Sequence, residues 1–584
     1  MRQFWIPFTS VALGLTSCAP TVRRYPLREP LSLDADLSSV SVPCHVEATA
    51  KEPHHVSCAP TPSYNPLIWD GLDNLLFRPL SESLGVADVG REAVDVNSMD
   101  EVPDSSWFTN RIGAKPMTLA ELDVGRCSPD TLLDGSKAPD GSWIIDKGKE
   151  EGATDGFRVT VPGKGHYLFK ADDADEPERG SAAQTVGTRI YHAAGYFVPC
   201  EQIVYFRPAV FTLKPGLIWK HNFTPAAPFG QAELEKIFAH SPRRGAFVRM
   251  QASAWLPGYN LGGSAFQGMR ADDPNDVIPH EDRRELRGKR LLDAWMDRVD
   301  DRKGNTLDTW IAATPGAPDG SPGHVIHHSL DTSEALGSLY DFDAVSRRLG
   351  YSYIWDWGDI GTDFVGLGTR TSVWETVQKT PGREVFAFMN VRDFVPDKWK
   401  NEYPIAAFSR MTEHDGAWMA RILARFTPDK VDRLARLSDY SNPEDTAYLV
   451  GLLEGRLEKI LERYLTVLSP LADLHMEGTS RLCGRNLAEW RSLRDATAFR
   501  YTANVVGRGW AEVVRRPAGE VCVVLPHVAP DGGPADDDAS RYVGVRVDDG
   551  VAKGPLLAFL YDLGPTRGYR LAGIERPPGK IRGN

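Results

Sequence analysis

Two stretches near the middle of the chain decide the expected fold, DAWMDRVDDRKGNTLDTWI (293–311) and HVIHHSLDTSEALG (324–337). The first begins as a helix and runs into Asp300 and Asn305, whereas the second is strand-like and ends at Asp331. Carboxylate and amide oxygens at loop and strand ends are the ligands that Mg²⁺ takes beside nucleotide phosphates. The pattern therefore predicts that Asp300, Asn305 and Asp331 gather at one site.

Upstream of these stretches the hydrophobic pattern takes a period of two, which is typical of strands. Short strands are expected in SWIIDKGKEEG (142–152), GFRVTV (156–161) and HYLFKA (166–171), with Gly-rich turns between them. A helix over about 182–194 follows, and more strands come after it. This order predicts a small sheet with one packed helix. Lys170 ends the third strand, where phosphoryl transfer uses a lysine near the phosphates.

The order of these parts resembles the atypical protein-kinase-like fold of the HipA kinases, the spore-coat CotH kinases and the secretory-pathway Fam-type kinases. The resemblance covers about residues 142–470. It implies that Lys170 is the strand lysine and that Asp300 is the catalytic aspartate that orients the attacking hydroxyl. It also implies that Asn305 and Asp331 bind the metal, and the spacing of Asp300 and Asn305 matches that of HipA-like kinases. With its VPDSSWF, TRIYHAAGY and PHEDRRELRG stretches, the chain also looks like a group of uncharacterised bacterial secreted proteins.

The resemblance implies Mg²⁺ (or Mn²⁺) with a nucleotide such as ATP as the cofactors. Gly148 and Gly152, in the turn after the first strand, are the candidate phosphate-contacting glycines. Gln184 stands in the helix where related sequences place the glutamate that pairs with the strand lysine, so it joins the candidate nucleotide site. Glu178, in the preceding loop, is the alternative partner for Lys170.

The N-terminus predicts a lipoprotein signal peptide over residues 1–17. A mostly apolar run from Phe4 to Leu15 leads to LTS directly before Cys18. This layout resembles the bacterial lipobox, in which the cysteine is acylated, and two or more acyl chains make a stable anchor. Ala19 resembles the pattern that is sorted to the outer membrane. We therefore expect a lipid-anchored protein of the bacterial cell envelope, with the membrane as a partner.

The expected fold class is α+β, a bilobed kinase-like core with additions at both ends. Residues 18–65 are rich in Pro, Ser, Thr and Ala and predict a flexible stalk. Residues 66–141 read as an N-terminal extension. The core divides into a β-rich N-lobe (142–250) and a helical C-lobe (251–470). Alternating short runs over 471–584 predict a small C-terminal β-sandwich.

Charge and cysteine content restrict the partners. The 584 residues hold 67 Lys and Arg against 79 Asp and Glu, a net charge of −12, which argues against a nucleic-acid ligand. Six cysteines besides Cys18 could form disulfides in an oxidising compartment, with Cys44 and Cys58 as the nearest pair. His324 and His328 lie in a strand-like run, where residues four apart do not meet, so this spacing does not predict a zinc site.

Several histidines and aromatic residues have structural interpretations. His280 and Glu281 open a long helix ending near residue 298, where an N-cap role is expected. His327 and His328 flank a buried strand and are expected to be core histidines with satisfied hydrogen bonds. The Tyr and Trp residues of 351–357 alternate as in a strand, which favours packing, with carbohydrate stacking as the alternative.

These observations lead to three hypotheses. The first is a lipid-anchored, extracytoplasmic kinase-like protein that binds a nucleotide and Mg²⁺ and transfers phosphate, or a nucleotidyl group, to a hydroxyl of a protein or glycan. Asp300, Asn305 and Asp331 favour it, although ATP is scarce outside the cytoplasm. The second is a catalytically inactive kinase-like scaffold, which Gln184 favours. The third is a glycan-binding envelope lipoprotein.

Overall fold

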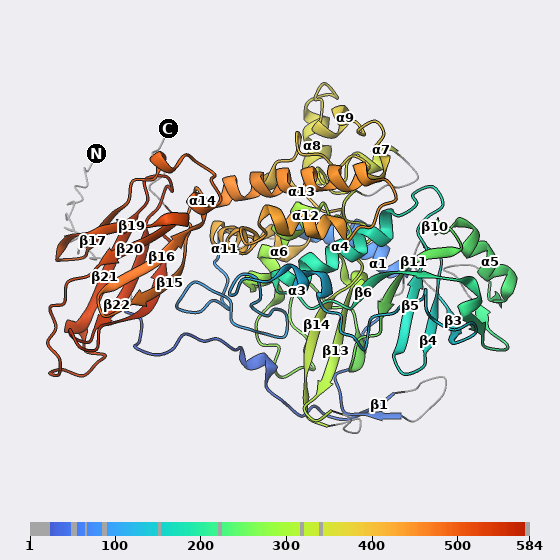
Figure 1. The fold of residues 1–584 in the computed structure, drawn as a ribbon, viewed down its shortest axis with the longest axis horizontal. Helices are drawn as coiled ribbons and strands as arrows, with labels where there is room; N and C mark the ends of the chain where they lie inside the picture. Colours follow the sequence, from blue (N-terminus) through green and yellow to red (C-terminus); the bar gives the residue numbers. More distant parts are fainter. Residues whose placement is uncertain are drawn as a thin grey trace, which may run out of the picture.

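The computed structural model describes most of the chain and mixes helices with several separate sheets, as the α+β expectation requires (Figure 1). In Figure 1 a β-rich C-terminal part, a helical centre and a second sheet follow one another from left to right. The described residues are 24–47, 55–64, 67–84, 90–149, 154–219, 225–315, 321–337 and 343–578.

A sheet built around three consecutive antiparallel strands carries Lys170. These are β3 (Trp143–Gly148), β4 (Gly156–Val161) and β5 (Gly165–Lys170), and β11 (Phe247–Ala254) continues the sheet from β5. Alternate side chains of β4 and β5 are buried in an aromatic core, which is the period-two pattern of the sequence. The remaining members are β6 (Glu201–Phe206) and β10 (Arg243–Arg244), both beside β11, and β7 (Phe211–Leu213), beside β3.

Helix α4 (Arg179–Ala194) connects β5 to β6 and is buried along nearly its whole length. Its small residues allow close approach to other segments. At Gly187 a Cβ atom would lie 2.6 Å from Thr332 Oγ1, so this position has no room for a side chain. The helix ends at Gly195, whose φ of 135° suits glycine. The expected helix over 182–194 is therefore observed, with one additional turn at its start.

The helical centre packs around α6 (Arg284–Met296), α11 (Glu413–Leu423) and α13 (Pro443–Tyr464). Their apolar faces, including Trp295 and Trp418, form one large core. A three-stranded sheet combines β12 (Tyr259–Gly262), which precedes α6, with β13 (Thr306–Ala312) and β14 (Gly323–Ser329), which follow it. The smaller helices of this part are α3 (Leu119–Val124), α7 (Asp343–Ser346), α8 (Trp357–Val365), α9 (Val373–Thr376), α10 (Ala406–Ser409) and α12 (Pro428–Arg436). Among the described residues, none of the helices is both long and apolar enough to cross a bilayer.

The C-terminal part consists of two antiparallel sheets with a shared apolar core, as the β-sandwich prediction expects. One sheet has the order β15-β16-β20-β19 and the other β18-β17-β21-β22-β23. The strands are β15 (Leu471–Glu477), β16 (Arg481–Asn486), β17 (Thr502–Val505), β18 (Gly509–Ala511), β19 (Val513–Arg515), β20 (Glu520–Val524), β21 (Tyr542–Asp548), β22 (Leu556–Asp562) and β23 (Tyr569–Glu575).

The described part of the expected stalk is folded against the rest of the protein, which corrects the flexible-stalk prediction. Tyr25 is buried and packs on Phe559 of β22, with ring centroids 5.4 Å apart. Asp36 is also buried and accepts hydrogen bonds from Ser106. The segment runs beneath the body in Figure 1. Cys44, before β1 (His45–Glu47), and Cys58, after β2 (His55–Ser57), form a disulfide, so the nearest pair in the sequence is linked. The other disulfides are Cys127–Cys200 and Cys483–Cys522.

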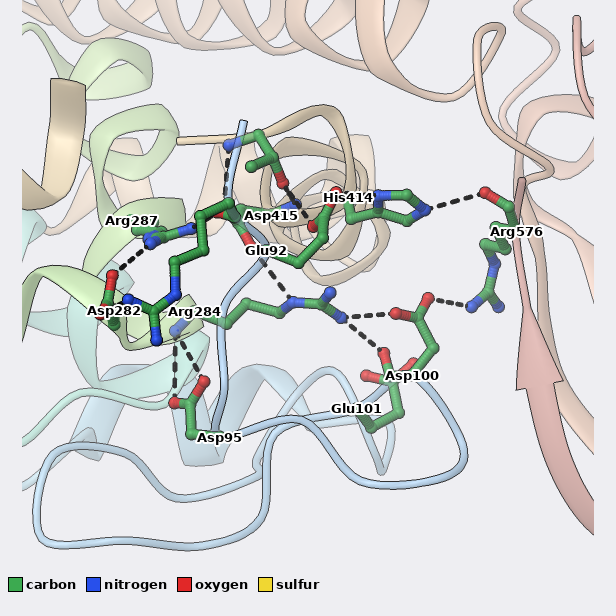
Figure 2. A network of polar contacts seen from close by, with 12 residues as sticks. Glu92, Asp95, Asp100, Glu101, Asp282, Arg284, Arg287, His414, Asp415 and Arg576 are labelled. Atoms are coloured by element: carbon green, nitrogen blue, oxygen red, sulfur yellow. Dashed lines mark hydrogen bonds and ion pairs between the residues drawn. The ribbon is translucent and has the colours of Figure 1, made fainter. Parts of the chain in front are cut away.

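A buried charge network connects α6, α11 and the C-terminal sandwich (Figure 2). Arg284 of α6 pairs with Asp100 at 2.6 Å and with Asp415 at 3.3 Å, and Arg576 also pairs with Asp100. Burial acts to raise the pKa of Asp100, but the neighbouring arginines outweigh it and hold the pKa well below its usual range. The arginines therefore balance the charge of Asp100 within the protein, although burial still raises the pKa of Asp415.

Candidate active site

The structure brings Lys170 and Asp331 together. Lys170 Nζ, at the end of β5, lies 2.7 Å from Asp331 Oδ2, in the turn after β14. The two side chains are 15% and 32% exposed, so the pair borders solvent. Asp331 Oδ1 accepts a hydrogen bond of 2.5 Å from the Ser333 hydroxyl. The strand lysine and the second metal-binding aspartate of the sequence analysis therefore face each other.

Asp300 and Asn305 form a second pair in the loop between α6 and β13. Asn305 Nδ2 donates to Asp300 Oδ2 and to the Asp300 carbonyl, both at 2.8 Å. Arg302 Nε donates to Asp300 Oδ1 at 2.9 Å, and the same guanidinium pairs with Asp70 of α1 (Leu67–Leu72). These contacts fix the orientation of the Asp300 carboxylate.

Backbone contacts connect the two pairs. Leu330 N donates to Asn305 O at 2.8 Å, so the residue before Asp331 lies against the Asn305 loop. The fully buried Arg298 donates to the carbonyls of Leu330 and Asp331, and Asp301 pairs with Arg298 at 2.8 Å. Asp331 itself has a positive φ of 33°, which non-glycine residues rarely adopt outside constrained sites. The turn after β14 is thus held rigidly beside Asn305.

Burial and neighbouring charges shift the pKa values of both carboxyl groups at this site. Burial raises the pKa of Asp300, although Arg302 opposes the shift, and Asp331 is one of the carboxylates that add to it. Burial also acts to raise the pKa of Asp331, but Lys170 and Ser333 hold it well below its usual range. Two carboxylates in one site repel each other unless a cation or a proton lies between them.

Two further charged residues belong to this region and were missed in the sequence analysis. Burial and the nearby Lys170 lower the pKa of Lys149, in the turn after β3, to about 8. Burial raises the pKa of Glu201, the first residue of β6, to about 7, against the attraction of Lys170. Lys149 was predictable only as part of the glycine-rich turn, and Glu201 carried no signal beyond its place at a strand start.

Gln184 contacts protein groups instead of a free site. Its amide oxygen accepts a hydrogen bond of 2.8 Å from Thr332 N, and its side chain also bonds Glu201. Gln251 of β11 donates to the same Glu201 carboxylate. In this arrangement Gln184 connects α4 to the turn that carries Asp331. The kinase-like resemblance implies a helix glutamate that pairs with the strand lysine. In this structure the acid within electrostatic range of Lys170 is instead Glu201, at the start of a strand.

Other candidate residues have different surroundings from those expected. Glu178, the alternative partner of Lys170, instead accepts hydrogen bonds from the backbone and hydroxyl of Ser441. At Gly148 a Cβ atom would lie 2.4 Å from the Trp219 ring, so packing of that ring explains the glycine. Gly152 lies outside the described residues, as do residues 1–17 and Cys18.

The histidines are structural. His327 is buried, bonds Asp308 Oδ1 at 2.6 Å and stacks on Trp107, and His328 is buried beside Thr309. His327 agrees with the core interpretation, whereas His328 is buried as expected but its Nδ1 has no hydrogen-bond partner among the described residues. The N-cap prediction for His280 and Glu281 is wrong. His280 lies in a 3-10 turn before α6, and its ring bonds Asp276 at 2.8 Å, while Arg283 takes the cap position.

The aromatic run 351–357 is not a strand, which corrects the alternation argument. Its first residues form turns, and Trp357 begins α8. Trp355 and Trp357 lie edge to face with centroids 5.5 Å apart and are both exposed. Tyr351 and Tyr353 instead line a cavity of about 660 Å³ together with Trp374.

One other group of described side chains has the spacing of metal ligands, and it lies in the C-terminal sandwich. Its members are Glu477, Cys483, Glu520 and Cys522. The two sulfur atoms are joined in a disulfide, so they are not available as thiolate ligands in this structure.

The Lys170–Asp331 and Asp300–Asn305 pairs lie on loops joined by the Leu330–Asn305 backbone hydrogen bond, and they comprise a cationic group, two carboxylates and an amide. Such a set can hold a hard cation and an anion side by side. No protein-family model matches this chain, and no curated protein is significantly similar to it. Chemical arguments about the site therefore rest on its own geometry.

Proposed function

We propose that the protein is a kinase-like transferase that binds a Mg²⁺–nucleotide and transfers phosphate, or a nucleotidyl group, to a hydroxyl. The observation that carries this proposal is the 2.7 Å contact between Lys170 and Asp331 beside the Asp300–Asn305 pair. Protein kinases place a strand lysine, a metal-binding Asp, a metal-binding Asn and a catalytic Asp around the phosphates in the same way. The four residues Lys170, Asp300, Asn305 and Asp331 match the residue types that this chemistry uses at those positions.

The residues fit a divalent cation. Asp331 and Asn305 would hold Mg²⁺ or Mn²⁺ through oxygen atoms, the donor type that these ions prefer. Burial is the main cause of the raised pKa of the Asp300 carboxyl, and Glu334 and Asp331 add to it, so a cation bound beside these carboxylates would favour the charged form of Asp300. A bound metal would neutralise charge that develops on the transferred phosphate.

The side chains can be given separate roles. Lys170, with Lys149 near it, would attract the phosphates. Burial and the nearby Lys170 lower the pKa of Lys149, and two neighbouring ammonium groups gain from an anion between them. Asp300, held by Arg302 and Asn305, would orient the acceptor hydroxyl and take its proton. Gln184 and Arg298 act as positioning residues, because they fix the turn that carries Asp331.

The order of elements supports the same proposal. Three antiparallel strands end at Lys170, a helix connects the third strand to the next one, and a hairpin of β13 and β14 separates Asn305 from Asp331. This is the order in which the kinase-like resemblance expects the lysine, the catalytic loop and the second metal ligand. The bilobed kinase-like core is part of the proposal.

A thermal-shift screen tests nucleotide binding. A ligand that binds only the folded state raises the melting temperature. We expect ATP or another nucleoside triphosphate to raise it in the presence of Mg²⁺ or Mn²⁺ but not with EDTA. The matched variant Lys170→Met should lose this shift, whereas Lys137→Met, at an exposed lysine, should keep it. If no nucleotide shifts the parent protein with either metal, the inactive-scaffold hypothesis replaces the proposal.

We further propose that Cys18 is acylated and anchors the protein to the cell envelope. The support is the sequence LTSC after an apolar run. Cys18→Ala should leave the detergent phase or remain unprocessed. If Cys18→Ala still partitions with membranes and is still cleaved like the parent, the anchor proposal is wrong.

Saccharide binding is a second candidate function, favoured by the cavity of about 660 Å³ that Tyr351, Tyr353 and Trp374 line together with Asp359 and Arg370. Aromatic faces with charged neighbours suit sugar rings. Quenching of tryptophan fluorescence by envelope saccharides, lost in Trp374→Ala, would support this function. Unchanged fluorescence at saturating saccharide would exclude it.

A further inference from the structure

A helical run close to the candidate site has its polar side inward and its apolar side outward. It consists of α1 (Leu67–Leu72), a π-helical turn (Asp73–Phe77) and α2 (Arg78–Leu84). Asp70 and Asn74 are only 5% and 3% exposed. The outer face of α1–α2 consists of large apolar residues that are all exposed, namely Ile68, Trp69, Leu72, Leu75, Leu76, Phe77, Leu80 and Leu84.

Such an arrangement reverses the usual amphipathic pattern of a surface helix. The inward polar residues are used by the protein, since Asp70 pairs with Arg302. Asp73 and Arg78 pair with each other at 2.9 Å, which neutralises two more charges of the run. The outer face therefore presents apolar area with little net charge. Contiguous exposed apolar area of this kind marks an interaction surface.

A second exposed apolar surface surrounds α8 and is called the α8 surface. Phe364 and Leu367 are 82% and 88% exposed, and none of the residues of α8 is buried. The helices α7, α8 and α9 project from the body at the top of Figure 1. The α8 surface consists of Trp355, Trp357, Ile360, Phe364, Val365 and Leu367.

The two surfaces flank the same loop. On one side, Asp70 of α1 contacts Arg302, which holds Asp300. On the other side, Glu402 N donates to Val299 O at 3.0 Å, and Ile354 N donates to Glu402 O at 2.9 Å. The residue before Asp300 is thus two backbone hydrogen bonds away from the start of the α8 surface.

We propose that the outer face of α1–α2 and the α8 surface dock together on a lipid bilayer and hold the Asp300 loop at the membrane interface. Both surfaces are outer faces of helices, and a fluid lipid surface can cover such faces without a matching shape. Their Trp, Phe and Leu content is typical of helices that lie in the interface. The expected anchor at Cys18 would keep the chain at the same membrane.

The charges indicate which lipid is favoured. Interfacial helices that recognise anionic lipids carry Lys and Arg beside the apolar face. Here α8 instead carries Asp359 and Asp363, and Asp363 is exposed. We therefore expect docking on zwitterionic lipid, and a weaker contact with anionic lipid. The proposal concerns where the protein lies and does not depend on whether the site transfers phosphate.

Fluorescent labels on the full-length protein in phosphatidylcholine vesicles test this proposal. Leu76→Cys places an environment-sensitive fluorophore on the outer face of α1–α2, and Phe364→Cys places one on the α8 surface. If the Leu76→Cys variant does not fold, Leu80→Cys is used in its place. Val528→Cys, on an exposed residue of the C-terminal part, is the matched control. The unsubstituted protein gives the background, because the six described cysteines are in disulfides.

We expect both test labels to shift to shorter wavelength and to lose most of their emission when the lipids carry nitroxide groups on their acyl chains. The Val528→Cys label should do neither. The proposal is overturned if either test label stays in water. It is also overturned if a label is shielded without acyl-chain quenching, which would indicate a protein partner or a second copy of this chain.

Discussion

The network around Arg284 and the cluster around Lys170 both bring charges into the protein, but they differ in how those charges are balanced. Arg284 and Asp415 have side chains only 4% and 0% exposed, and arginines outweigh the effect of burial on Asp100 (Figure 2). In the Lys170 cluster, Asp331 remains 32% exposed and the pKa of the Asp300 carboxyl is raised.

This difference separates a structural role from a binding role. A buried ion network with every group paired contributes to a defined fold, and breaking it leaves a buried charge without a partner. A cluster of carboxylates that borders solvent can gain from a bound cation instead. We therefore expect changes in the first cluster to alter stability and changes in the second to alter ligand binding or turnover.

The largest effect is expected when the matched network is broken. Arg284→Met removes the partner of Asp100 and Asp415 and should cost about 3–5 kcal/mol of stability. Chemical denaturation followed by circular dichroism measures this loss. Asp432→Asn, on the exposed face of α12, breaks a 2.8 Å pair with Arg436 and should leave the transition unchanged. Equal midpoints for Arg284→Met and the parent would show that the network is not structural.

Asp300→Ala should reduce turnover far more than nucleotide affinity. A residue that orients the hydroxyl and takes its proton acts mainly in the transition state, so a loss of roughly 10²–10⁴-fold in rate is expected. Mass spectrometry of phosphate or nucleotidyl incorporation, in incubations with envelope extract, measures the rate. Calorimetry measures the affinity. A parallel loss of both quantities would place Asp300 among the ligand-binding groups instead.

A smaller, pH-dependent effect is expected from Glu201→Gln. The pKa of Glu201 in the folded protein is about 7, above its ordinary value of 4.5, so its protonated form favours folding. That contribution is complete below the unfolded pKa and is lost as the pH rises through about 7. At about pH 8 the glutamine variant should be more stable by roughly 1–3 kcal/mol, and at about pH 5 the difference should vanish.

Melting temperatures of Glu201→Gln and the parent at both pH values check this sign. Gln251→Glu adds a second acid beside Glu201 and should show the opposite trend, with stability falling further at high pH. If the difference in melting temperature between Glu201→Gln and the parent is the same at both pH values, the raised pKa is contradicted.

Local patterns predicted much of the fold. Strands β3, β4 and β5 were found because alternating apolar residues and glycine turns specify them within a few residues. The position of Lys170 followed from the same pattern. The spacing of short polar motifs does not determine which loops come together. The gathering of Asp300, Asn305 and Asp331 was therefore predicted from residue chemistry and from the kinase-like resemblance.

Long-range packing decided what the sequence could not indicate. Tyr25 lies in a segment whose composition is typical of a flexible linker. It nevertheless packs on Phe559 of β22, the strand next to the edge strand β23 of the C-terminal sheet. Glu201 becomes part of the site only because β6 pairs with β11, which pairs with β5. Neither contact leaves a local signal in the sequence, because the partners are far apart along the chain.

The central claim is that the Lys170–Asp331 cluster binds a nucleotide through a divalent cation. Isothermal calorimetry of the parent, Asp331→Asn and Asp432→Asn with ATP, with and without Mg²⁺, tests it most directly. We predict Mg²⁺-dependent binding by the parent and Asp432→Asn, and a loss of at least about tenfold in affinity for Asp331→Asn, whose fold should be retained. A parent protein that binds no nucleotide at millimolar concentration with Mg²⁺ would contradict the claim.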